Sequence, residues 1–357
     1  MQNIVISGYY GFDNLGDEAI LAAIIEGIKQ QRQGRITVLS ANPSQTAVRY
    51  GVAAVNRNNP TEVLGAIQKS ELLISGGGSL LQDITGWKSI PYYLSHVLLA
   101  QLFGKKTVFF AQGIGPVRGK LAQFLIKRIG NRTNEITVRD PRSRDLLRQF
   151  GIRAELIRVA VDPVFIFKKR CWGQGWQLLK KAGLAPEKKI MAISVKPWGD
   201  NRYLPELARA AQSWSETTGY QLLIIPLHYR QDLALSQRLQ AMLKGAHLLT
   251  EPYGPVEMLE IFAEIDFLLG VRFHSLVFAA IHNCPFVAIN YDPKISGLLS
   301  QYALNSQVLI GDFTAESLER ICTAVWQNRA GFKQILEQRG EEFYQLAQKN
   351  IEMLLQL

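Results

Sequence analysis

Apolar, strand-like runs alternate with helical patterns along most of the chain, and this alternation constrains the fold more than any other feature of the sequence. Such alternation favours βαβ units, in which parallel strands form a sheet and helices cover its faces. In the first half of the chain we expect strands at residues 3–7, 35–39, 72–75, 106–111, 135–138 and 154–158, and helices at residues 18–31, 60–69, 92–103, 120–131 and 143–150.

Residues 162–174 break this pattern with a proline, a cationic triplet and a Trp-Gly-Gln-Gly sequence, as an interdomain connection does. Beyond the break we expect strands at residues 190–195, 221–226, 247–249, 267–269 and 286–289, and helices at residues 204–217, 231–243, 255–263, 275–283 and 315–357. A length of 357 residues suits two domains of roughly 150 residues each. We therefore predict an α/β protein with two Rossmann-like, doubly wound parallel-sheet domains facing across a cleft, at residues 1–165 and 166–330, and a C-terminal helix at 331–357 that packs back on the first domain.

Charge and cysteine content limit the possible partners. A net charge of +10 and a pI near 9.5 favour anionic partners, but the cations are scattered without interleaved aromatic residues, so we expect no nucleic-acid partner.

The three cysteines form no CxxC pair and no Cys/His cluster; they are Cys171, Cys284 and Cys322. This pattern predicts buried thiols in a reducing compartment and no metal site. The first residues favour a strand over a signal peptide, and no apolar run is long enough to cross a bilayer, so we expect a cytoplasmic protein.

A glycine-rich turn follows the first expected strand. Its glycines, Gly8, Gly11 and Gly16, lack the spacing of a dinucleotide fingerprint. The polar residues between and after them are Asp13, Asn14 and Asp17. Carboxylates there would repel a pyrophosphate, whereas short amides and carboxylates hydrogen-bond well to the hydroxyls of a sugar. Asp17 or Asn14 could equally cap the following helix, and the sequence leaves both interpretations open.

A second glycine-rich segment, residues 75–83, follows another strand. Its three consecutive glycines, which include Gly77 and Gly78, allow the backbone to approach a ligand closely, and we expect Ser79 to cap the next helix or to bind the ligand. Asp83 is a further candidate for the same side of the site. Residues 111–116 repeat the design and are expected to complete the same wall.

Two arginines are candidates because each follows a strand. Arg139 ends the strand at 135–138, although a salt bridge to Asp140 is an alternative role. Arg272 and His274 lie in a short turn between an apolar strand and a helix, where unpaired helix N–H groups, a guanidinium fork and an imidazole would together suit an anion and a proton transfer. Lys196 also ends a strand, and His228 is a weaker candidate.

Together these motifs resemble those of the polysaccharide pyruvyl transferase family, in particular its CsaB-like members. The resemblance rests on the order and spacing of the segments that begin at Gly8, Ser75, Gln112, Arg139, Asp162, Arg272 and Tyr291. It implies a GT-B-like fold and the transfer of pyruvate from phosphoenolpyruvate onto two hydroxyls of one sugar as a cyclic ketal, with release of phosphate.

The resemblance also implies roles for individual residues. Arg272 and Arg139 would hold the donor, with Ser275 and Lys196 beside them, and His274 would be the general acid. An arginine is commoner in the family where this chain has Lys196, which keeps the charge but loses the guanidinium fork. We expect no metal or cofactor, because the cationic side chains would neutralise the donor phosphate.

On the acceptor side, the resemblance implies a lipid-linked or polymeric cell-wall glycan that contains N-acetylmannosamine. The acceptor would meet Asp13, Asn14, Asp17, Gly77, Gly78, Ser79 and Asp83, with one of the three aspartates as the base. The basic helix at residues 120–132 would allow peripheral contact with anionic lipid on the inner face of the plasma membrane.

Two other functions fit the same residues. One is a nucleotide-sugar glycosyltransferase or epimerase on the same fold, in which Arg272 would hold a diphosphate and Glu257 or Glu260 a ribose. That function predicts tight binding of a uridine or guanosine nucleotide. The other is a non-catalytic glycan- or lipid-binding protein, which predicts that His274→Ala leaves function intact.

Overall fold

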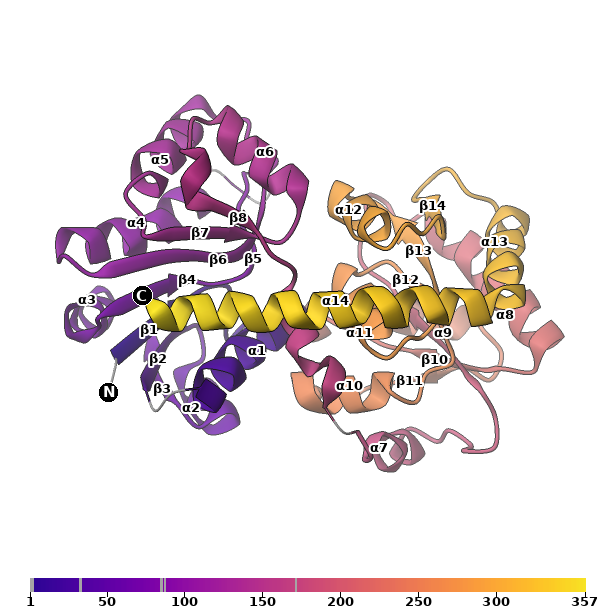
Figure 1. Ribbon diagram of the computed structural model, residues 1–357. Helices are drawn as coiled ribbons and strands as arrows, with labels where there is room; N and C mark the ends of the chain where they lie inside the picture. The colour runs from indigo at the N-terminus through magenta and orange to yellow at the C-terminus, as the bar shows by residue number, and fades with distance from the viewer. Residues whose placement is uncertain (1–2, 32–33, 84–85, 87, 171) are drawn as a thin grey trace. The chain divides into compact units, whose positions relative to one another are not determined.

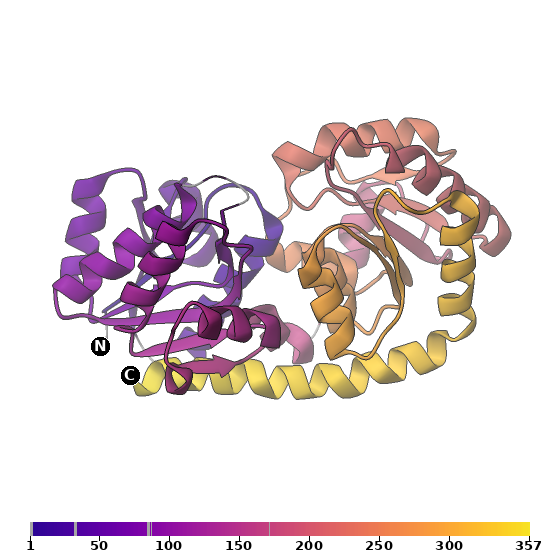
Figure 2. The ribbon, with the colours of Figure 1, turned by 90° about the horizontal axis from the view of Figure 1, so that it is seen from above.

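The computed structural model describes residues 3–31, 34–83, 86, 88–170 and 172–357. The chain forms two compact units, one of residues 1–166 with 343–357 and the other of residues 167–342. Each unit contains one parallel β-sheet with helices packed on it (Figures 1 and 2). The prediction of two α/β units with parallel sheets is therefore confirmed.

The first unit is built on an eight-stranded sheet in the order β3-β2-β1-β4-β6-β7-β8, with β5 paired to β6. All of its strand pairs are parallel. Its strands are β1 (Asn3–Ser7), β2 (Arg35–Ser40), β3 (Ala53–Asn56), β4 (Leu72–Ser75), β5 (Gly78–Leu81), β6 (Lys106–Ile114), β7 (Glu135–Val138) and β8 (Ile157–Val159).

Helices cover this sheet in the way that βαβ units require. They are α1 (Leu15–Gln31), α2 (Pro43–Tyr50), α3 (Pro60–Lys69), α4 (Ser89–Leu102), α5 (Lys120–Gly130) and α6 (Pro141–Gln149). One hydrophobic core joins the sheet to the inner faces of α3, α4, α5 and α6, so these four helices share one side of the sheet. Burial of this apolar surface is the main force that holds the layer together.

The second unit repeats the design with a six-stranded parallel sheet in the order β11-β10-β9-β12-β13-β14. Its strands are β9 (Ile190–Ser194), β10 (Gln221–Ile224), β11 (His247–Leu248), β12 (Phe267–Gly270), β13 (Phe286–Asn290) and β14 (Gln307–Leu309). Its helices are α7 (Gly175–Lys181), α8 (Tyr203–Thr218), α9 (Tyr229–Met242), α10 (Pro255–Phe262), α11 (Phe273–Ile281), α12 (Pro293–Gln301) and α13 (Ala315–Gln327).

The C-terminal helix α14 (Arg329–Gln356) contributes to the core of each unit. In the second unit Phe332 packs edge-to-face on Phe286, with ring centroids 5.4 Å apart. In the first unit Phe343 packs in the same manner on Phe165, at 5.1 Å. Among the described helices, none combines the length and apolarity that a bilayer crossing needs.

Several local expectations were wrong. The glycine triplet opens strand β5 rather than a helix, and the next helix begins only at Ser89. Strand β6 continues to Ile114, through residues expected in a loop. Residues 154–156 form a 3-10 helix, so that strand begins at Ile157. Besides β5, the sequence did not predict the helices α2, α7 and α12 or the strands β3 and β14.

Two of the three cysteines lie in the described part of the chain. Cys284 and Cys322 are free and buried, as expected. Burial raises the pKa of both thiols well above the usual value, so they remain protonated at neutral pH. Cys171 lies outside the described residues.

Candidate functional site

The turn between β12 and α11 carries the strongest candidates in the second unit. Arg272 is the N-cap residue of α11, and its extended backbone lets the helix begin at Phe273. Ser275 is buried, and its hydroxyl donates a 2.6 Å hydrogen bond to the carbonyl of Arg272. This contact fixes the turn. The sequence placed His274 before the helix, whereas in the structure it lies in the first turn of α11.

A buried carboxylate orients the Arg272 guanidinium. Nε of Arg272 donates to Oδ2 of Asp232 at 2.9 Å, and Nη2 donates to Oδ1 of the same carboxylate. The Asp232 side chain is fully buried in the first turn of α9, and Oδ2 also accepts the backbone N–H of His228 at 2.8 Å. A bidentate pair of this kind holds the planar guanidinium in one orientation. Sequence reasoning missed Asp232, because an acidic residue in a first helical turn is ordinarily a solvated helix-dipole partner.

Two lysines and a tyrosine lie next to this pair. The ammonium group of Lys196 lies 4.3 Å from the ring centroid of Tyr291, and that of Lys294 lies 5.6 Å from the same ring. Burial lowers the pKa of Lys196 to about 8, with further lowering by the positive charges of Arg272 and Lys294. The three cations are therefore close enough to repel one another. A bound anion would reduce this electrostatic repulsion.

Lys196 carries the least compensated charge of the three. The charge of Arg272 is balanced by buried Asp232, and Lys294 lies 3.5 Å from Asp292. Lys196 instead packs on the faces of Tyr291 and Trp198. Of these groups, Lys196 has a charge that an additional anion could balance, and Arg272 has a guanidinium held in a fixed orientation.

His274 differs from the other histidines in its surroundings. His96 accepts or donates a 2.8 Å hydrogen bond with Ser7, and burial lowers its pKa to about 4. Burial likewise lowers the pKa of His282 to about 3. Both rings are therefore neutral at physiological pH, as structural histidines buried in a core usually are. His228 is buried, and His274 is partly exposed beside the ring of Phe273.

In the first unit Arg139 is buried and joins three segments. Its Nη1 lies 3.3 Å from Oδ2 of Asp162, and its Nη2 donates to the hydroxyl of Ser79 at 3.0 Å. A Cβ at Gly113 would lie 2.8 Å from the guanidinium, so a side chain at position 113 would have to displace it. Asp140 caps α6 by accepting the N–H of Ser143 at 2.7 Å. The donor-binding role of Arg139 stays a prediction.

The first glycine-rich turn places Asp17 next to the second. Asn14 precedes α1 and accepts the N–H of Gly16 at 3.2 Å, so it takes the capping role. Its amide donates to the carboxylate of Asp17. A Cβ on Gly78 would lie 2.7 Å from Oδ1 of Asp17, which shows how closely this carboxylate approaches the bare backbone of the glycine triplet. Asp13, in the same turn, has a left-handed backbone with φ of 58°.

The remaining predicted acceptor-side residues have local contacts of their own. Oδ2 of Asp83 accepts the backbone N–H groups of Arg118 and Gly119 at 2.6 and 2.9 Å, so this carboxylate fixes the start of α5. Gly77 is packed against Ile20, where a Cβ would lie 2.9 Å from the isoleucine side chain. Of the three candidate aspartates, Asp83 is thus committed to the backbone, and Asp17 stands nearest to the glycine triplet.

Two further residues stabilise the first glycine-rich turn. Buried Glu18 accepts the N–H of Gly11 at 2.7 Å and the hydroxyl of Tyr50, and burial raises the pKa of this carboxyl group. Arg57 donates to the carbonyl of Gly8 at 2.9 Å, with its guanidinium 5.1 Å from the ring centroid of Phe12. Neither residue was predicted, because each acts through contacts distant in sequence.

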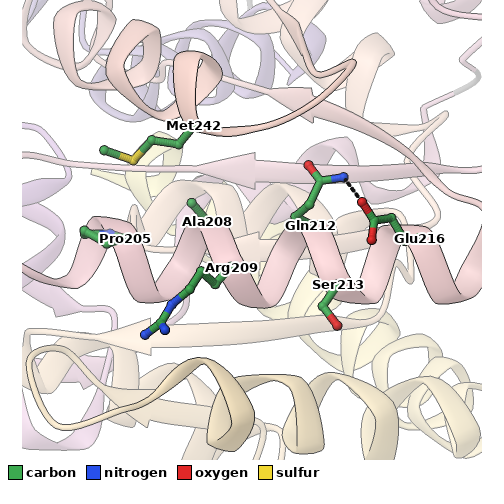
Figure 3. Close-up of a pocket in the computed structure, with 7 residues that line it drawn as sticks. All are labelled: Pro205, Ala208, Arg209, Gln212, Ser213, Glu216 and Met242. Carbon is green, nitrogen blue, oxygen red and sulfur yellow. Dashed lines mark hydrogen bonds between the residues drawn. The ribbon is translucent and has the colours of Figure 1, made fainter.

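One surface hollow of about 470 Å³ lies away from these candidates, along α8 (Figure 3). Figure 3 shows Gln212 and Glu216 pointing toward each other, and the amide donates to the carboxylate at 2.8 Å. The hollow is lined by Pro205, Ala208, Arg209, Gln212, Ser213, Glu216 and Met242. It contains no predicted site residue. Within the described residues, no group of three or more His, Cys, Asp or Glu side chains could hold a metal ion.

Comparison with known proteins gives a family and a fold. The sequence model of polysaccharide pyruvyl transferases matches residues 14–293. The amylovoran biosynthesis protein AmsJ of Erwinia amylovora is 23% identical over 258 residues, which cover 67% of this chain but only 61% of that protein.

Solved structures extend the likeness over the whole chain. HepE of Anabaena, solved with UDP and glucose, aligns with a TM-score of 0.67 at 12% identity and covers 100% of this chain and 99% of its own. The UDP-GlcNAc 2-epimerase of Neisseria meningitidis, bound to UDP-GlcNAc, aligns with a TM-score of 0.66 at 10% identity and covers 99% and 100%. At such identities the likeness shows the fold alone, which is GT-B-like as predicted.

Proposed function

Because this chain belongs to the polysaccharide pyruvyl transferase family, we propose that it transfers pyruvate from phosphoenolpyruvate to two hydroxyls of one sugar in a glycan. The products are a cyclic ketal and inorganic phosphate. The acceptor is a lipid-linked or polymeric glycan, with N-acetylmannosamine as the candidate sugar. The proposal rests mainly on one observation. Arg272 is held in a fixed orientation at the start of α11, and Lys196 and Lys294 lie close to it.

The second unit offers what an enol phosphate donor needs. Phosphoenolpyruvate carries a phosphate and a carboxylate, and Lys196, Lys294 and Arg272 supply positive charge for both. The N-terminal N–H groups of α11 add hydrogen-bond donors for an anionic oxygen. Arg139 in the first unit is the further donor-binding candidate, and binding would require its guanidinium to exchange a contact with Asp162 or Ser79 for the donor.

In the proposed reaction, a sugar hydroxyl adds to the enol carbon C2 while the methylene carbon C3 receives a proton. His274 supplies that proton as general acid. The hydroxyl proton passes to a base on the acceptor side, for which we favour Asp17 over Asp13 and Asp83 because of its position at the glycine triplet. The second hydroxyl then displaces the phosphate, whose leaving oxygen takes up the second hydroxyl proton, and the ketal closes.

Phosphate release from phosphoenolpyruvate with a panel of lipid-linked and aryl-linked disaccharides tests this function. We expect release that depends on the acceptor, with a mass gain on the sugar equal to one pyruvyl ketal. No release with any acceptor, together with tight binding of a uridine or guanosine nucleotide, would contradict the proposal and favour the glycosyltransferase alternative.

The depressed pKa of Lys196 predicts a pH-dependent donor affinity. With a pKa of about 8, Lys196 is cationic at pH 7 and largely neutral at pH 9, while the donor phosphate is a dianion throughout. Since the cation attracts the phosphate, affinity falls as the pH rises through 8. We expect the KM for phosphoenolpyruvate to rise about tenfold between pH 7 and pH 9.

Two substitutions at this position control the measurement. Lys196→Arg keeps its charge across this range and should flatten the rise in KM, because a guanidinium stays protonated. Lys196→Met should give a high KM that barely changes with pH. A rise in KM that persists in both variants would assign the titration to another group and contradict the role of Lys196.

A further inference from the structure

Helix α5 in the first unit has an outer face that combines bare apolar side chains with cations. Leu121 is 70% exposed and Phe124 is 57% exposed, whereas Ile126 and Ile129 on the inner face are buried in the core. Exposure of two large apolar side chains one helical turn apart costs free energy in water unless another phase covers them.

Cations surround these two side chains. Residues 118–132 contain five cationic residues and no acidic one. They are Arg118, Lys120, Lys127, Arg128 and Arg132, and all five are exposed. Lys120 and Arg128 lie one turn to either side of Phe124, so the phenylalanine is flanked by positive charge along the helix. Among the salt bridges found in the described part of the chain, none includes any of these five cations.

From this surface we propose that α5, with Arg118 and Arg132, docks on an anionic lipid surface. An interfacial helix inserts its apolar side chains between lipid headgroups while its cations pair with lipid phosphates. A nucleic-acid backbone would match the charges but would leave Leu121 and Phe124 in water, so the exposed pair favours lipid. The docking itself concerns location, and only its link to the acceptor rests on the proposed function.

The position of α5 connects this docking to the proposed acceptor side of the site. The helix follows β6 directly, so it begins at the carboxyl edge of the sheet. There the Asp83 carboxylate ties the N–H groups of Arg118 and Gly119 to the segment after β5. The docking face therefore starts beside the glycine-rich segments that we assign to the acceptor, where a membrane-held glycan would have to arrive.

Vesicle flotation tests the proposal with paired variants. The full-length protein is mixed with vesicles of phosphatidylcholine alone or of phosphatidylcholine with phosphatidylglycerol, at low and high salt. We expect flotation only with the anionic vesicles, weakening as salt rises. The expected partition coefficient falls about tenfold or more for Leu121→Ser/Phe124→Ser, and about tenfold for Lys127→Gln/Arg128→Gln.

The matched control is Val48→Ser, which removes an 88% exposed apolar side chain on α2 and should float like the unchanged protein. Flotation of Leu121→Ser/Phe124→Ser at the unchanged level would overturn the proposal, because adsorption would then follow net charge alone. A dimer in gel filtration that this variant dissociates would overturn it in favour of a second copy. Binding to duplex DNA or RNA without vesicle binding would reassign the cations to nucleic acid.

Discussion

Replacement of His274 by alanine is expected to lower the turnover of pyruvyl transfer by about 10²- to 10⁴-fold, the usual contribution of a positioned general acid. The physical reason is that the methylene carbon of phosphoenolpyruvate needs a proton donor, and the ring of His274 lies in the first turn of α11, two residues after Arg272. The KM for the donor should change far less than kcat. Steady-state phosphate release with a saturating acceptor measures both constants.

Matched variants separate chemistry from folding in this experiment. His274→Gln keeps a polar side chain of similar size and should be nearly as slow as the alanine variant. His247→Ala removes a histidine of the same unit that hydrogen-bonds to the carbonyl of Ala182 at 3.0 Å, and it should retain turnover within about twofold. Full turnover of His274→Ala with an intact fold would instead support a non-catalytic binding protein or a different proton donor.

The sequence predicted the sheets better than the connections between them. Long apolar runs with period-2 or 3.6-residue patterning identify buried strands and helices directly, as for β9 and α8. Strand β5 was missed because the glycine triplet that leads into it resembles a loop. Helices α2 and α12 begin at Asn42-Pro43 and Asp292-Pro293, with the Asn or Asp side chain capping the helix. An Asn or Asp followed by proline is a recognisable helix start signal, but a prediction based on apolar runs alone does not detect it.

In the candidate site, too, some residues could be predicted from the sequence and others could not. Residues at the ends of strands, such as Lys196 and Arg272, could be identified because parallel strands place their carboxyl ends at one edge. Their partners could not, because Asp232 lies 40 residues before Arg272 in the sequence and meets it only through the packing of α9 beside the β12–α11 turn. The depressed pKa of Lys196 likewise depends on burial and on neighbours that only the folded chain brings together.

Replacement of Arg272 by alanine is expected to damage both stability and donor binding, and the two effects can be separated. Loss of the guanidinium leaves the buried Asp232 carboxylate without its counter-charge, which should lower the free energy of unfolding by about 3–5 kcal/mol. Urea unfolding followed by circular dichroism measures this loss. Arg339→Ala, which breaks the exposed pair with Glu342, is the control and should cost at most about 1 kcal/mol.

The double variant Arg272→Ala/Asp232→Asn then isolates the functional role. The asparagine removes the buried charge and can still accept the N–H of His228, so most of the lost stability should return. Donor binding should not return, because the oriented fork is absent from both variants, and affinity for phosphoenolpyruvate should stay about 10²-fold below that of the unchanged protein by calorimetry. If the double variant bound the donor normally, Arg272 would be a structural partner of Asp232 alone. The anion site would then rest on Lys196, Lys294 and the first turn of α11.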